Sequence, residues 1–275
     1  MDPIPLQPSI IYGPVRSRRL GASLGLNASP ITYKLCSFNC VYCQYGWTTV
    51  HTMDTADRLG DFPAPHDFRQ ALKNTLSENK EIDNITFSGN GEPTLHPQFE
   101  ELVDIAKELR DNYFPKANIG ILSNSSTVNI EKIRRALAKL DFKIMKLNAG
   151  DLTVFRKINR PGKAVDYEVI VKGLKSLKDV ILQTMFVDGT IQNIGDKEVA
   201  EWIKRVGEIR PIKVQIYSLH RPPAEPSLQE VPAETLREIA ARTEETTGVP
   251  AEVIVAKQPY RRRTSPHDPE KDTAS

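Results

Sequence analysis

The chain is poor in cysteine and has no long hydrophobic run. It contains three cysteines in 275 residues, an odd number too small for a disulfide framework. No run of about 18 apolar residues is present, so we expect no transmembrane helix. The proline-rich first ten residues lack the hydrophobic segment of a secretory signal, and we therefore expect a cytoplasmic protein.

An excess of charge of one sign is lacking as well. The 37 Lys and Arg residues nearly balance the 35 Asp and Glu residues, which gives a net charge of +2. Charge alone predicts no polyanionic partner, although a local basic patch stays open. With 39% hydrophobic and 26% charged residues, the composition is that of an ordinary globular protein. A wholly disordered, collagen-like or coiled-coil chain is therefore excluded.

All three cysteines lie in one segment of eight residues. Cys36, Cys40 and Cys43 form a Cys-x3-Cys-x2-Cys pattern. Clustered thiols in a reducing compartment point to a metal site. Three thiolates on one loop can bind three irons of a [4Fe–4S] cluster and leave the fourth iron open. The alternative is a zinc site with His51 as fourth ligand, although zinc ligands usually come in pairs separated by a longer spacer.

The rest of the chain alternates strand-like and helix-like segments. Short apolar runs bounded by turn formers predict strands at 30–35, 84–88, 119–123, 144–147, 180–187 and 214–218. Helical periodicity predicts helices at 66–80, 99–109, 130–140, 167–178, 196–208 and 233–247. Strand–helix repeats imply a parallel sheet with right-handed crossovers. Six such units predict a curved sheet or partial barrel, with the cysteine loop at the carboxyl edge of the strands.

A second motif follows the second predicted strand. Gly89, Asn90, Gly91 and Glu92 precede Pro93. The two glycines allow the backbone to approach a ligand closely, and Glu92 supplies a carboxylate. By itself this pattern could equally be a plain strand-to-helix turn.

Together, Cys-x3-Cys-x2-Cys and Gly-Asn-Gly-Glu-Pro resemble the radical S-adenosylmethionine (SAM) superfamily. The resemblance implies an α/β fold, a (βα)6 partial TIM barrel of the radical SAM type. It also implies that Cys36, Cys40 and Cys43 bind a [4Fe–4S] cluster and that SAM is the second cofactor. One electron would cleave SAM to a 5′-deoxyadenosyl radical, which abstracts hydrogen from a substrate. The implied protein partner is a one-electron donor of the flavodoxin or ferredoxin type.

The resemblance assigns further residues to SAM binding, and they are Tyr42, Gly89, Asn90, Gly91, Glu92, Ser123, Asn124 and Asn148. Tyr42 would pack near the adenine, and the four motif residues would bind the amino group. The last three fall where ribose and carboxylate contacts often occur. Asn90 departs from the second glycine that is common in the family.

Shorter segments narrow the resemblance to one branch. Residues 13–21, 43–46, 158–161 and 221–225 look like radical SAM proteins related to the tRNA wyosine-base enzyme, 4-demethylwyosine synthase. That enzyme uses a second cluster held by additional cysteines. This chain has none left, so the wyosine reaction itself is not expected.

Basic residues suggest the kind of substrate. Contacts are predicted at Arg16, Arg18, Arg19, Arg160 and His220. Guanidinium groups suit an anionic or RNA-related substrate, including tRNA, through bidentate hydrogen bonds. The alternative is a solvated surface with internal salt bridges.

The chain is expected to form one radical SAM domain at 1–257. Its core spans about 12–225, a C-terminal helix and strand extend it over 226–257, and a polar tail at 258–275 is expected to be disordered. Two other functions stay open: activation of a glycyl-radical partner protein, and a non-catalytic zinc or iron–sulfur binding module.

Overall fold

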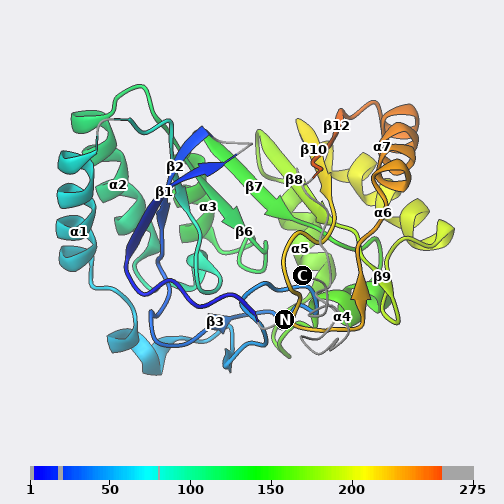
Figure 1. Cartoon of the computed structure of the whole chain (residues 1–275), viewed down its shortest axis with the longest axis horizontal. Coiled ribbons are helices and arrows are strands. Elements are labelled where there is room, and N and C mark those ends of the chain that lie inside the picture. Colours follow the sequence, from blue (N-terminus) through cyan, green and yellow to red (C-terminus); the bar gives the residue numbers. More distant parts are fainter. Residues whose placement is uncertain (1–2, 18–20, 80, 256–275) are drawn as a thin grey trace, which may run out of the picture.

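The centre of the molecule is a curved sheet of mostly parallel strands (Figure 1). The computed structural model describes residues 3–17, 21–79 and 81–255. In spatial order the strands are β1 (Ile11–Ser17), β2 (Gly21–Leu26), β5 (Asn84–Phe87), β6 (Asn118–Ser123), β7 (Phe142–Lys146), β8 (Val180–Met185), β10 (Lys213–Tyr217) and β12 (Ala251–Val253). β1 pairs with β2 in the antiparallel sense, and every other neighbouring pair is parallel.

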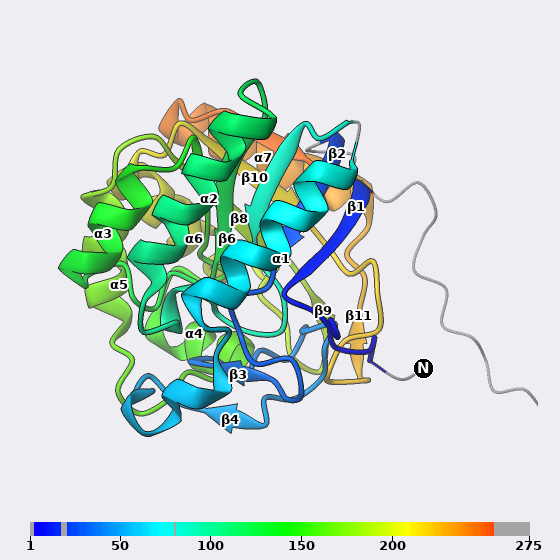
Figure 2. The same cartoon turned by 90° about the vertical axis from the view of Figure 1, so that its left-hand side faces the viewer.

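Helices cover the outer side of this sheet (Figure 2). They are α1 (Pro65–Glu78), α2 (Phe99–Tyr113), α3 (Glu131–Ala138), α4 (Leu152–Asn159), α5 (Tyr167–Lys175), α6 (Asp196–Ile209) and α7 (Ala233–Thr247). The six helices predicted from periodicity are confirmed, whereas the short α4 was not predicted. In the described part of the chain, no helix has both the length and the apolar character that a membrane span requires.

Smaller elements complete the fold. They are the 3-10 helices η1 (Ala56–Asp61) and η2 (Pro93–Leu95), the parallel pair β3 (Leu35–Cys36) and β4 (Val50–His51), and the antiparallel pair β9 (Asp188–Gly189) and β11 (Leu228–Gln229). β3 and β4 lie at the same end of the molecule as α4 in both views (Figures 1 and 2).

The expected fold class is confirmed. β2, β5, β6, β7, β8 and β10 are parallel strands joined by helical crossovers, which is the arrangement of a (βα)6 partial TIM barrel. β12, from the predicted C-terminal extension, joins the sheet beside β10. The predicted tail at 258–275 lies outside the described residues.

The predicted first strand is wrong. Residues 30–35 lie outside the main sheet, and only Leu35 belongs to a strand, the two-residue β3. The strand that precedes the cysteine loop is β2, whose glycines interrupt the apolar pattern. At Gly25 a Cβ atom would come within 2.1 Å of the Tyr12 ring on β1, so close packing of the edge strand explains this glycine.

The two faces of the sheet differ in chemistry. Leu24 and Ile85 are fully buried and belong to the apolar core under the helices. Alternate residues face the inner side, where Ser23 Oγ lies 3.2 Å from Thr86 Oγ1 in a hydrogen bond. The inner side thus carries polar side chains, and parallel α/β folds place their ligands at the carboxyl ends of the strands.

Candidate active site

The cysteine loop is hydrogen-bonded to the end of α4 and to a loop after β10. Val41 N donates to Ile158 O at 3.0 Å, and Gly162 N donates to Ser37 O at 2.9 Å. On the other side, Glu225 N donates to Val41 O at 2.8 Å. Segments far apart in the sequence therefore hold the backbone of this loop in place.

Two asparagine side chains donate hydrogen bonds to cysteine sulfurs. Asn124 Nδ2 lies 3.4 Å from Cys36 Sγ, and Asn159 Nδ2 lies 3.4 Å from Cys40 Sγ. Asn124 directly follows β6, and Asn159 is the last residue of α4. Because a thiolate is a stronger acceptor than a thiol, these amide donors suit sulfurs that are ionised by a metal.

Burial keeps the thiols of Cys36 and Cys40 protonated. Burial raises the pKa of Cys36 to about 12, although the nearby positive charge of Lys34 opposes the shift. Burial and the charge of Cys43 raise the pKa of Cys40 as well. Such thiols release their protons only when a metal replaces them.

The donor set fits an iron–sulfur cluster. Among residues 3–17, 21–79 and 81–255, no group of three or more His, Cys, Asp or Glu side chains is arranged to hold a single metal ion. A [4Fe–4S] cluster instead binds each cysteine to a different iron, and hydrogen bonds to its sulfurs are common. His51, the alternative zinc ligand, donates from its Nε2 to Ser37 O at 3.0 Å.

The Gly-Asn-Gly-Glu loop follows β5 and contacts the start of the cysteine loop. Gly89 has a φ of +137°, which favours glycine. At Gly91 a Cβ atom would come within 1.7 Å of Leu35 O. Glu92 N donates to the same carbonyl at 3.3 Å. The two glycines are therefore needed for close contact between the two loops.

The Glu92 carboxylate is buried and links this loop to the end of β6. Its Oε1 accepts from Thr94 Oγ1 at 2.6 Å and from Ser123 Oγ at 2.8 Å. Its Oε2 accepts from Asn124 N at 2.6 Å. Burial raises the pKa of Glu92, and these hydrogen bonds oppose the shift. The predicted residues Glu92, Ser123 and Asn124 thus lie together, and Asn124 connects them to Cys36.

The side chain of Asn90 is engaged in hydrogen bonds within the protein, and the place of Asn90 in the SAM site stays a prediction. The residue is fully buried, and its Oδ1 accepts from Gln7 N at 2.7 Å. Its Nδ2 donates to Gln7 O at 2.9 Å and to Pro30 O at 3.1 Å. Asn90 replaces the common glycine because its side chain ties the N-terminal segment to the motif loop. Any contact of Asn90 with a ligand would therefore come from its backbone.

Asn148 is likewise hydrogen-bonded within the protein. It is 2% exposed, its Nδ2 donates to Tyr42 OH at 2.7 Å, and its Oδ1 accepts from Met185 N at 2.9 Å. The amide therefore positions Tyr42 and the end of β8. Tyr42 is itself buried, and Lys146 Nζ lies 5.0 Å from the centroid of its ring.

A row of polar residues on the inner face was missed by the sequence analysis. Lys146 on β7, Gln183 on β8 and Gln215 on β10 are register neighbours. Gln183 Nε2 donates to Gln215 Oε1 at 3.1 Å, and Tyr217 OH donates to Gln183 Oε1 at 3.2 Å. Burial alone would lower the pKa of Lys146, but the interaction with Tyr217 holds it above its usual value. Polar residues inside otherwise apolar strand segments were the available signal.

Two predicted substrate residues lie at the carboxyl end of the barrel. Arg160 follows α4, and its guanidinium carbon lies 4.7 Å from the centroid of the Trp47 ring, next to the cysteine loop. His220 comes three residues after β10, is half-buried, and has Nδ1 3.0 Å from the carbonyl of Leu219.

The other predicted arginines are not placed there. The backbone of Arg16 pairs with Ala22 near the amino end of β2, so Arg16 lies at the opposite edge from the cysteine loop. This corrects its placement over the barrel mouth, because the prediction did not include the antiparallel β1. Arg18 and Arg19 lie outside the described residues.

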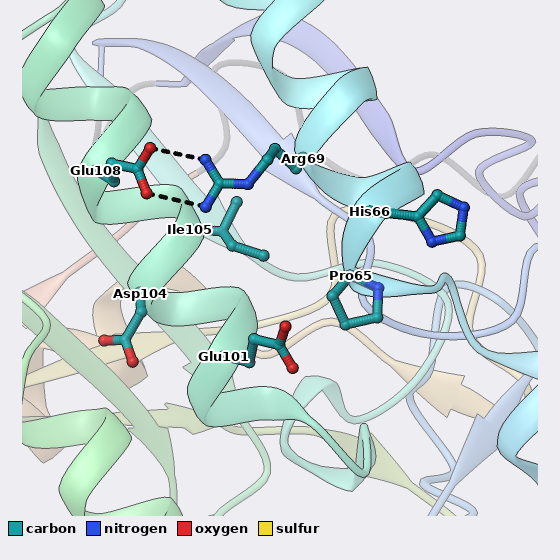
Figure 3. A pocket seen from close by; sticks show the side chains of 7 residues that line it. All are labelled: Pro65, His66, Arg69, Glu101, Asp104, Ile105 and Glu108. Carbon is teal, nitrogen blue, oxygen red and sulfur yellow. Dashed lines mark hydrogen bonds and ion pairs between the residues drawn. The ribbon is translucent and has the colours of Figure 1, made fainter.

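A surface pocket lies between α1 and α2, apart from all these residues (Figure 3). Arg69 and Glu108 bridge it through two hydrogen bonds of 2.7 and 2.9 Å. No predicted site residue lines it, so the pocket has no part in the cysteine site.

Comparison with known proteins gives a family match. The family model of the radical SAM superfamily matches residues 31–206. A UPF0026 protein of Methanocaldococcus jannaschii is 33% identical over 249 residues, which cover 87% of this chain and 73% of that protein. The protein named GTPase Obg in Brachyspira hyodysenteriae is 33% identical over 214 residues; the match covers 77% of this chain and 30% of that protein.

Solved structures share the fold. A radical SAM methyltransferase from Sphaerobacter thermophilus has a TM-score of 0.63 at 14% identity, over 86% of this chain and 67% of that chain. TYW1 with a bound lysine–pyruvate adduct has a TM-score of 0.55 at 16% identity, over 82% of this chain and 74% of that chain. At these identities the likeness concerns the fold alone.

Proposed function

The chain belongs to the radical SAM superfamily and to the UPF0026 proteins, and we propose that it is an enzyme that uses SAM to abstract hydrogen from an anionic organic substrate. The observation that supports this most directly is the pair of amide hydrogen bonds to Cys36 and Cys40 within one buried loop. Family membership implies a [4Fe–4S] cluster and SAM as cofactors, and it implies a substrate and an electron donor.

Cys36, Cys40 and Cys43 would hold the cluster. When bound, the cluster supplies the electron that cleaves SAM to a 5′-deoxyadenosyl radical. Asn124 and Asn159 would orient Cys36 and Cys40 by donating to their sulfurs. The tight contact of Gly91 with Leu35 would keep the motif loop against the cysteines.

The motif loop and the end of β6 would hold SAM. The backbone of Gly89, Asn90 and Gly91 can approach the amino group closely, because two of the three residues lack a side chain. Glu92 would position the motif loop and the end of β6 rather than contact SAM itself, because its carboxylate already accepts hydrogen bonds from Thr94, Ser123 and Asn124. Tyr42 would border the adenine from the cysteine loop.

The polar row on the inner face would bind the substrate. Lys146 is a cation near the cysteine sulfurs, and it neighbours the amide groups of Gln183 and Gln215. A cation beside neutral hydrogen-bonding groups suits a substrate with a carboxylate or phosphate next to polar atoms. No step of the GTPase type is proposed, since the sequence has no G-x-x-x-x-G-K-[ST] segment for nucleotide phosphates.

The first test is anaerobic formation of 5′-deoxyadenosine. Reconstituted protein receives dithionite and SAM, and the product is quantified by chromatography. We expect formation in the wild type and in the exposed control Ser77→Ala, and none in Cys40→Ala, which should also lose the visible absorbance of the cluster. Equal formation in Cys40→Ala would refute the assignment.

A second test concerns the motif loop. Glu92→Gln places an amide where a carboxylate accepts from four donor groups, so one N–H of the new amide opposes another donor. We expect weaker SAM binding with the cluster retained, and no change in the exposed control Glu81→Gln. Unchanged SAM affinity in Glu92→Gln would remove this loop from the SAM site.

A further inference from the structure

The end of α4 brings the molecular surface close to the cysteine sulfurs. Asn159 is 1% exposed and donates to Cys40 Sγ, whereas the next residue, Arg160, is partly exposed. Asn39 N donates to the carbonyls of both residues at 3.1 Å, which fixes the cysteine loop directly beneath this turn. At this turn, about one residue therefore separates solvent from the sulfur of Cys40.

The same turn is rich in positive charge. Arg156, Lys157 and Lys163 are exposed, and Arg160 lies over the ring of Trp47, which is itself 40% exposed. We refer to these five residues as the α4 face. The described ion pairs include none of its four cations.

Residues 152–165 carry these four cations and no Asp or Glu. Elsewhere on the surface Arg69 pairs with Glu108, Arg135 with Glu100 and Lys139 with Asp104. The net charge of the whole chain is only +2. The α4 face is thus a local excess of positive charge around an exposed aromatic ring, at the place where the surface comes near Cys40.

We infer that the α4 face is the docking surface for an acidic one-electron carrier protein of the flavodoxin or ferredoxin type. This rests on the proposed function, which requires an electron from outside the chain. One electron passes from the reduced carrier to the cluster held by the three cysteines, so the carrier is oxidised by one electron and the cluster is reduced by one. No proton or chemical group is transferred.

Proximity favours a carrier over RNA at this face. Electron transfer requires a short path to the cluster. The turn that carries the α4 face is joined to the cysteine loop by backbone hydrogen bonds. An RNA substrate would instead need to reach the inner row of Lys146, Gln183 and Gln215 on the sheet. Complementary charge would speed the encounter with an acidic carrier and make its rate depend on salt.

The test compares two reductants in two matched variants. Arg156→Glu/Lys157→Glu reverses two charges in the last turn of α4, and the control Lys172→Glu/Lys175→Glu reverses two in the last turn of α5. We measure cluster reduction by photoreduced flavodoxin in stopped flow, and 5′-deoxyadenosine formation with dithionite, both without oxygen. A gel-shift titration with bulk tRNA accompanies them.

At low salt, flavodoxin should reduce the cluster of the α4 variant at least about tenfold more slowly than that of the wild type. The rate in the variant should also depend less on salt concentration. Its dithionite-driven product should match the wild type within about twofold, and the α5 variant should resemble the wild type in both assays. If flavodoxin reduces the cluster of the α4 variant as fast as that of the wild type, the docking assignment is overturned. The same holds if the α4 variant loses tRNA binding while this rate is unchanged. Absence of product from wild type with dithionite would instead refute the proposed function.

Discussion

The side-chain amide of Asn159 donates a hydrogen bond to the sulfur of Cys40 over 3.4 Å, although 119 positions separate the two residues. Asn159 is 1% exposed, and its Oδ1 has no hydrogen-bond partner among the described residues. A buried amide with one atom unpartnered is costly for folding. We therefore interpret Asn159 as a residue kept for its effect on the sulfur.

Replacing Asn159 should change the reduction potential of the cluster. Asn159→Ala removes an N–H donor that stabilises the more negative, reduced state, so the midpoint potential should fall. A loss of about 1 kcal/mol corresponds to roughly 40 mV for a one-electron couple. The measurement is a redox titration followed by electron paramagnetic resonance. Asn193→Ala, at a buried asparagine with no contact to a cysteine, should leave the potential unchanged.

Replacing Gly91 should disturb the cysteine loop. In Gly91→Ala the new Cβ would lie 1.7 Å from Leu35 O, a backbone atom one residue before Cys36. Since the backbone must move, we expect a loss of about 3 kcal/mol in stability and poor cluster incorporation. Urea unfolding and iron content measure the two effects. Gly60→Ala, with open space around its Cβ position, should show neither effect.

Replacing Asn90 should free the N-terminal segment. Asn90→Ala removes three hydrogen bonds to Gln7 and Pro30, which predicts a loss of about 2 kcal/mol. Hydrogen exchange should become faster in residues 3–9, while 5′-deoxyadenosine formation stays within about threefold of the wild type. The exposed Asn74→Ala serves as control. If SAM cleavage is lost while exchange in residues 3–9 is unchanged, the side chain has the direct SAM role that we exclude.

Protonation of His96 should destabilise the protein below neutral pH. Burial lowers the pKa of His96, whose Nε2 donates to Pro63 O at 2.9 Å and whose Nδ1 accepts from Gln98 N at 3.0 Å. A proton on Nδ1 would oppose the Gln98 donor. Below pH about 6.5 the unfolded state therefore binds more protons than the folded state, and stability falls as pH falls.

Denaturant unfolding between about pH 5 and pH 7.5 tests this. The slope of stability against pH should be smaller in His96→Gln than in the wild type. His66→Gln, at an exposed histidine, should keep the slope of the wild type. An identical slope in His96→Gln would show that other groups cause the acid sensitivity.

Local sequence patterns determined the architecture and singled out the candidate metal ligands. Each predicted strand after 30–35 is present, and so is each predicted helix, because an apolar face of period 2 or 3.6 must be buried whatever it packs against. Cys36, Cys40 and Cys43 were evident because three cysteines in one short segment need no long-range information. β2 was missed because its glycines are explained only by neighbours, the side chain of Asp83 at Gly21 and the ring of Tyr12 at Gly25.

The tertiary structure decided which polar side chains are free. Asn90 and Asn148 fit SAM-binding positions in the sequence, yet their amides donate to Gln7 O and to Tyr42 OH. Asn159, which no motif singles out, donates to Cys40 instead. Sequence specifies which groups can form hydrogen bonds. Their partners depend on contacts between residues far apart in the sequence, 119 positions in the case of Asn159 and Cys40, and only the folded chain brings such residues together.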